Sequence, residues 1–119
     1  MDGTAPPSAT VIYEVCVSVP EAANAAYASY MTETHIPAIL ATGRFVDIVM
    51  CVSADAALGV PDDGFTYYNT RYYAASETAL RDYLERDAPA LRQDFLLHVP
   101  AGAQVSRRVW AQKAAWKRV

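Results

Sequence analysis

Two short elements of the chain carry a proline in the same setting, 52 residues apart. The first is His35-Ile36-Pro37-Ala38, and the second is Asp87-Ala88-Pro89-Ala90. Each closes a stretch in which apolar residues recur at helical spacing, and each stretch lies between two strand-like runs. A chain that contains a strand–helix–strand unit twice has few ways to bury both helices, so this repeat constrains the fold more than any other feature.

Four segments have the composition and alternation of strands. The first, 11–19, places its larger apolar residues on one face: Tyr13, Val15, Val17 and Val19. The others are 44–53, 65–74 and 105–111. In the second segment, strict alternation predicts Phe45 on one face with Asp47, Val49 and Cys51, and Ile48 on the other with Val46, Met50 and Val52.

The two helical stretches have an apolar stripe each. The first contains Tyr27, Tyr30 and Met31, and the second begins after Ser76, a residue typical of a helix N-cap. Proline disfavours helical geometry in the residue before it, so Ile36 is expected to be a break or kink, and the element around Pro89 repeats it.

The order of elements is therefore βαββαβ. Right-handed crossovers place the first and third strands in the centre of a four-stranded antiparallel sheet, with two helices on one face. This is an α+β, ferredoxin-like fold with one uncovered sheet face, which we expect a second copy of the chain to cover. The predicted organisation is a flexible N-terminal tail (1–10), a single ferredoxin-like domain (11–112) and a basic C-terminal tail (113–119).

Charge is unevenly distributed along the chain. The net charge of −3 argues against a nucleic-acid-binding domain, yet five of the ten basic residues lie between positions 107 and 119, together with Trp110 and Trp116. Such a tail could contact RNA or acidic lipid. The alternative, which we favour, is a final strand followed by a solvated or partner-covering tail, with no nucleic acid and no membrane as partners.

Composition also bears on location and cofactors. The first ten residues have neither a basic start nor an apolar core, and no apolar run approaches the length of a membrane span, so a soluble, cytoplasmic protein is expected. Cys16 and Cys51 lie among valines and are interpreted as reduced core thiols. No two of the histidines and cysteines stand at metal-ligand spacing, and a haem would need a large apolar pocket, so neither a metal nor another cofactor is expected.

Several of these elements together resemble a bacterial family of small domains of unknown function. The resemblance covers about 11–111 and rests on the following segments: Ile12-Tyr13-Glu14-Val15, His35-Ile36-Pro37, Leu40-Ala41-Thr42-Gly43, Tyr72-Tyr73-Ala74, Ala88-Pro89-Ala90-Leu91-Arg92 and Ser106-Arg107-Arg108-Val109. It implies membership of the dimeric α/β-barrel group, in which two sheets pack face to face. That group includes cofactor-free polyketide monooxygenases, aromatic cyclases, haem-dependent enzymes, degradation enzymes and plain ligand binders, so the fold leaves the chemistry open.

The candidate site is His35. In related cyclases and monooxygenases the substrate cavity lies between sheet and helices and is lined by aromatic residues. His35 could act there as a general base towards a phenolic or β-keto substrate, with the Tyr72 hydroxyl holding the developing oxyanion. The predicted ligand-binding residues are Tyr13, Tyr27, Tyr30 and Tyr67. Alternatively, His35 caps backbone carbonyls at the helix break; His98 is expected to be a surface or C-terminal cap residue.

Two functions from different classes remain open. In the first, a homodimer binds a small apolar or aromatic, polyketide-like molecule between sheet and helices, with or without cofactor-independent cyclase or monooxygenase-type catalysis by His35. In the second, the chain is a noncatalytic accessory or protein-interaction dimer whose pocket is filled by its own side chains. The volume of the cavity beside His35 discriminates between them.

Overall fold

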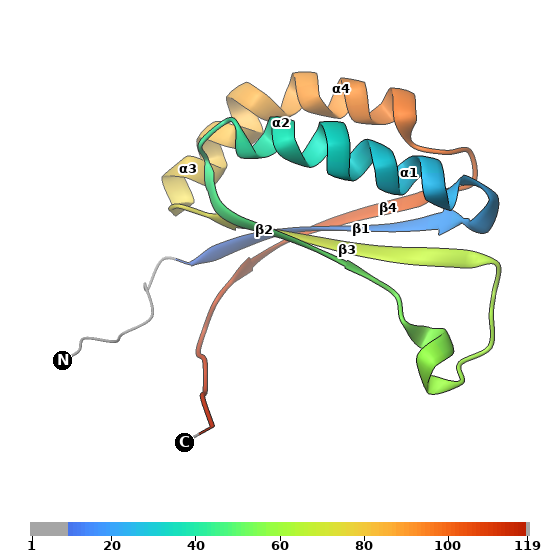
Figure 1. Cartoon of the computed structure of the whole chain (residues 1–119). Coiled ribbons are helices and arrows are strands. Elements are labelled where there is room, and N and C mark those ends of the chain that lie inside the picture. The colour runs from blue at the N-terminus through green and yellow to red at the C-terminus, as the bar shows by residue number, and fades with distance from the viewer. Residues whose placement is uncertain (1–9, 119) are drawn as a thin grey trace.

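A four-stranded antiparallel sheet with all main helices on one side makes up the molecule (Figure 1). The computed structural model describes residues 10–118, so the predicted N-terminal tail lies almost wholly outside the described residues. The strands are β1 (Val11–Pro20), β2 (Phe45–Val52), β3 (Phe65–Ala74) and β4 (Gln104–Ala111). The helices are α1 (Asn24–Tyr30), α2 (Ile36–Leu40), α3 (Glu77–Asp82) and α4 (Ala88–His98), with short turns η1 (Glu21–Ala23) and η3 (Asp55–Leu58).

The strand order is β2-β3-β1-β4, which confirms the prediction that the first and third strands are central. In the register of β1, Tyr13 lies between Tyr72 of β3 and Val109 of β4, and Glu14 lies between Arg71 and Arg108. Side chains alternate between faces along each strand, so these pairings define a helix-covered face and an open face. Ser76 caps α3 as expected, because its hydroxyl oxygen accepts a hydrogen bond from the Ala79 N–H.

Neither helix breaks at its proline. The chain passes from α1 to α2 and from α3 to α4 through π-helical turns, η2 (Met31–His35) and η4 (Tyr83–Asp87). Ile36 has helical angles (φ −63°, ψ −45°), and its N–H bonds the Met31 carbonyl five residues back. The predicted break at Ile36 is therefore wrong: one extra residue per turn keeps the backbone hydrogen-bonded while making room for the proline ring.

An irregularity in β2 changes which way Phe45 faces. Phe45 pairs with Ala74 and Asp47 pairs with Tyr73, so two steps along β2 match one step along β3. This β-bulge puts Phe45 on the same face as Ile48, and its ring packs 4.9 Å from the ring of Tyr83. The prediction that Phe45 and Ile48 lie on opposite faces is wrong, because alternation cannot reveal the extra residue.

The helix-covered face holds two adjoining clusters of buried residues. One cluster surrounds Tyr13 and Tyr72, and the other surrounds Val17, Tyr27 and Phe95. The cysteines lie elsewhere: Cys16 is half-buried and Cys51 is exposed, and both pair with Asn69 on the open face. The prediction that they are core thiols is wrong, because strand alternation turns them away from the helices.

Candidate functional site

His35 is buried at the end of the first π-helical turn. Only 8% of its surface is exposed, and its ring lies 5.1 Å from the ring of Phe95 in α4. It also stacks on Tyr30, five residues earlier, at 5.5 Å. The extra residue of a π turn re-aims the side chains around it, and such turns occur frequently at functional sites.

A hydrogen-bond chain links His35 to a carboxylate. The Tyr30 hydroxyl donates to Asp94 Oδ2 at 2.7 Å, and His35 Nδ1 lies 3.3 Å from the same hydroxyl oxygen. A phenol has one proton to donate, and an ionised carboxylate can only accept, so His35 Nδ1 carries a proton and donates to Tyr30. The Nε2 atom is then the unprotonated nitrogen of a neutral ring.

This hydrogen bond also bears on the alternative interpretation of His35 as a helix cap. Its partner is a side chain, and no side-chain cap involving His35 is formed at the start of α2. The prediction that His35 caps backbone carbonyls is therefore wrong, because the π turn already satisfies the backbone. His98 does take the role of a terminal cap: its Nδ1 donates to the Asp94 carbonyl at 2.9 Å, while its ring stacks on Tyr30 at 4.1 Å.

Burial controls the protonation of His35. The pKa of its imidazole is lowered to about 4, mainly by loss of solvation; Asp94 opposes this shift, and nearby Arg107 and His98 contribute to it. The ring is therefore neutral at neutral pH. Burial, together with the bond to Asp94, raises the pKa of the Tyr30 hydroxyl well above its usual range, so that hydroxyl also keeps its proton.

A small cavity lies beside His35, between the two core clusters. Its volume is about 20 Å³, enough for one water molecule. The lining residues come from the sheet, η2, α2, η4 and α4: Tyr13, Val15, Met31, His35, Ile39, Tyr72, Tyr83, Arg92, Phe95 and Arg107. The structure thus brings together three of the predicted site residues, His35, Tyr72 and Tyr13.

The other predicted ligand-binding tyrosines do not line this cavity. Tyr30 is hydrogen-bonded to His35 and does not line the cavity. The ring of Tyr27 packs against the ring of Tyr68 at 5.0 Å, and its buried hydroxyl has no hydrogen-bond partner within residues 10–118. Tyr67 lies on the open face and bonds Asp63 through its hydroxyl. Alternation in β3 carries the signal for Tyr67, since it turns Tyr68 and Tyr72 towards the helices and Tyr67 away.

Two arginines at the cavity were not predicted as site residues. Arg92 of α4 donates to the Tyr13 hydroxyl at 3.0 Å, and Arg107 of β4 pairs with Val15 and so faces the helices. Both residues are exposed to solvent. The cavity therefore has an aromatic interior and a cationic mouth. Register against β1 distinguishes Arg107 from Arg108, which lies over Trp110 on the open face at 5.5 Å.

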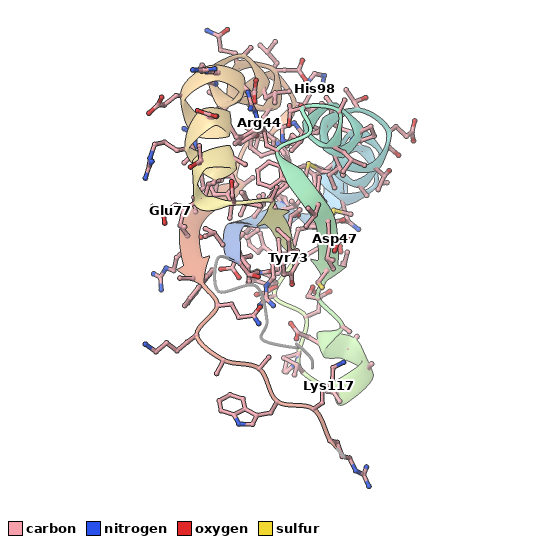
Figure 2. All side chains as sticks on the ribbon, turned by 90° about the vertical axis from the view of Figure 1, so that its left-hand side faces the viewer. Arg44, Asp47, Tyr73, Glu77, His98 and Lys117 are labelled. Atoms are coloured by element: carbon pink, nitrogen blue, oxygen red, sulfur yellow. The ribbon has the colours of Figure 1, made fainter. Side chains whose placement is uncertain are left out.

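Asp87, the counterpart of His35 in the repeat, has a different surrounding. Its carboxylate accepts from Arg44 Nε at 2.9 Å, and Asp82 lies 3.8 Å from the same guanidinium. Arg44 precedes β2 and lies close to the helical layer (Figure 2). The aspartate thus connects η4 to the start of β2. The second half of the repeat therefore has an ion pair at the position where the first half has a buried histidine.

A βαββαβ chain with this sheet order and both helices on one face is a ferredoxin-like α+β protein, and its candidate site is a tyrosine-lined cavity with one buried histidine. The family model described as "Domain of unknown function (DUF4286)" matches residues 10–108, and the chain belongs to this family. A search of curated proteins found no match to the chain.

Among solved structures, the chain is similar to the crystal structure of a monooxygenase from the gene ActVA-Orf6 of Streptomyces coelicolor, in complex with the ligand nanaomycin D. The TM-score is 0.69, the sequence identity is 16%, and the match covers 96% of each chain. The likeness extends over nearly the whole chain and shows the fold.

None of the helices formed between residues 10 and 118 combines the length and apolar character that crossing a membrane requires. The same residues contain no group of three or more His, Cys, Asp or Glu side chains arranged to hold a metal ion.

Proposed function

We propose that this protein is a homodimer that binds a small aromatic molecule with an acidic group, a carboxylate or a phenol, in the cavity beside His35. The observation that carries the proposal is the make-up of the cavity wall: aromatic rings inside, a neutral histidine with one free nitrogen, and two arginines at the mouth. An aromatic ring fits the tyrosines, and an acidic group fits the guanidinium ions.

The mouth is the part of the cavity that can open. A volume of about 20 Å³ does not hold an aromatic ring, so a ligand must displace a side chain. Arg92 is exposed and is held there by one hydrogen bond to Tyr13, whose loss costs about 1 kcal/mol. When the Arg92 side chain moves outward, the Tyr13 hydroxyl becomes free to bond the ligand. The Arg92 guanidinium can then form an ion pair with the acidic group of the ligand.

Catalysis makes a further demand on His35. An imidazole with a pKa of about 4 accepts a hydrogen bond well but is a weak base. Cyclase or monooxygenase-type chemistry through Nε2, with Tyr72 holding the oxyanion, therefore requires a bound anion to raise this pKa. In this form of the proposal the proton moves from the substrate to Nε2, and Tyr30 and Asp94 stabilise the resulting imidazolium.

The likeness to the nanaomycin D complex supports a small-molecule ligand, because it extends over nearly the whole of both chains. The cavity volume favours the second candidate, a noncatalytic dimer whose pocket is filled by its own side chains. In that case the hydrogen-bond chain from His35 to Asp94 only joins α4 to η2. For both candidate functions we propose a cytoplasmic location and a folded domain that extends from residue 11 to residue 112.

Salicylate tests the binding proposal, since it combines a ring, a carboxylate and a phenol. We expect it to shift the NMR resonances of the His35 imidazole, and Arg92→Ala to weaken its binding about tenfold, the value of one charge-assisted hydrogen bond. Arg81→Ala is the matched control, because Arg81 pairs with Glu77 on the outer surface. Unchanged His35 resonances at millimolar salicylate would favour the filled-pocket dimer.

The homodimer is proposed to form through the open sheet face. Large side chains there remain about half exposed in one chain, including Val49 at 45%, Tyr67 at 43% and Trp110 at 44%. Glu14 and Arg71 form an ion pair at 3.3 Å in the middle of this face, so these two charges enter the interface as a pair.

Val49→Glu is expected to convert the dimer to a monomer at micromolar concentration, as measured by light scattering. Two-fold symmetry would bury an additional carboxylate from each copy opposite Arg71, which already pairs with Glu14, and an interface of this kind does not tolerate the excess negative charge. Leu97→Glu on the outer side of α4 is the control, since Leu97 is 82% exposed on the helical layer. A wild-type protein that is already monomeric would contradict the proposal.

A further inference from the structure

The two ends of the open sheet face differ in shape. At the end next to the β2–β3 connection several side chains are small, namely Cys16, Ser18, Cys51 and Ser106, and together with Tyr67 they line a hollow of about 540 Å³. The opposite end carries Trp110 and leads into the segment 112–118. One half of the face is thus concave, and the other half is bulky.

The same two ends carry opposite charge. The β2–β3 connection beside the hollow contains Asp55, Asp62 and Asp63, and segment 112–118 contains Lys113, Lys117 and Arg118. Both project from the sheet on the side away from the helices (Figure 1), and Lys117 lies far below the sheet in the side view (Figure 2).

Segment 112–118 has little attachment to its own domain. Its first residue donates a backbone hydrogen bond from Gln112 N–H to the Thr10 carbonyl at 3.0 Å, and a cavity of about 390 Å³ lies between the segment and its own sheet, lined by Lys113 and Trp116 and, on the sheet, by Glu14, Arg71 and Trp110. Trp116 is 88% exposed, more than any other large hydrophobic residue in the described part of the chain. Burying an indole ring is favourable, and its own chain leaves this ring in water, which indicates that Trp116 binds another surface.

We propose that segment 112–118 of each protomer lies in the hollow of its partner, with the Trp116 indole filling the space above Cys51 and the basic side chains against the partner's acidic β2–β3 connection. A two-fold axis that runs across the strands brings the bulky end of one face over the concave end of the other. Seven extended residues span about 23 Å, enough to cross most of a strand's length. This inference rests on the proposed homodimer.

The native cysteines supply the test. In Trp116→Cys, mild oxidation is expected to give a covalent dimer on a non-reducing gel, and peptide mapping should join position 116 to Cys51 or Cys16. The variant that also carries Cys16→Ser and Cys51→Ser is the control and should stay uncrosslinked. Wild-type protein oxidised in the same way measures any link between the native thiols.

Three results would overturn the arrangement. A covalent dimer of the control variant would mean that the two 112–118 segments contact each other. A 116–51 link within a single chain would mean that the segment covers the hollow of its own chain. A Trp116→Cys protein that is dimeric by light scattering but uncrosslinked would place the segment elsewhere. A monomer by light scattering contradicts the homodimer itself, so the two proposals fail in distinguishable ways.

Discussion

The free energy of unfolding is expected to fall by about 3 kcal/mol between pH 7 and pH 4 because of His35 alone. The pKa of this imidazole is about 4 in the folded protein, against an ordinary value of 6.5. Between pH 6.5 and pH 4, His35 is protonated in most unfolded chains and unprotonated in most folded ones. Acid therefore favours unfolding, and the stability conferred by the neutral ring is lost as the pH falls through this window.

Urea unfolding at several pH values measures this effect as the difference between wild type and His35→Gln. The contributions of the carboxylates to the free energy of unfolding cancel in this difference, because they titrate in both proteins. The difference is expected to change by about 3 kcal/mol between pH 7 and pH 4. His98→Gln is the matched control; it replaces the exposed histidine and should retain most of the fall. Parallel curves for wild type and His35→Gln would show that His35 is protonated as readily in the folded state as in the unfolded chain.

Phe95→Ala is expected to destabilise the protein by about 3 to 5 kcal/mol at neutral pH. Phe95 is 3% exposed and packs against Tyr27, Tyr30 and His35 with ring distances of 6.4, 6.5 and 5.1 Å. Removing its ring leaves a void where α4 meets α1 and η2. Water entering this void would also raise the pKa of His35 towards its ordinary value.

The next residue provides the control for this substitution. Leu96 is 65% exposed, so Leu96→Ala should change the free energy of unfolding by less than about 0.5 kcal/mol. Chemical denaturation gives the stability of both variants, and NMR titration gives the His35 pKa. A loss below about 1 kcal/mol in Phe95→Ala would contradict the packing of α4 against His35.

Local patterns accounted for the strands, their order and the two helices. Alternation in β1 was sufficient to group Tyr13 with Val15, Val17 and Val19 on one face, because the faces of a strand depend only on residue parity. The same rule failed at Phe45, where one inserted residue reverses parity, and the rule for residues before proline failed at Ile36, where a π turn absorbs the ring.

The sequence also singled out His35, yet not the groups that set its chemistry. Asp94 reaches Tyr30 from a position 64 residues away, and Arg92 meets Tyr13 across 79 residues. No local pattern encodes such pairs, since they exist only when α4 packs against α1 and the sheet.

By itself, then, the sequence determined the βαββαβ order, the shared face of the large apolar residues in the first strand and the one histidine of the repeat. Tertiary structure alone decided that this histidine is neutral, which of its nitrogens is protonated and how small the cavity beside it is. The physical reason is that periodicity depends on neighbouring residues, whereas desolvation, hydrogen-bond partners and cavity volume depend on which distant side chains meet.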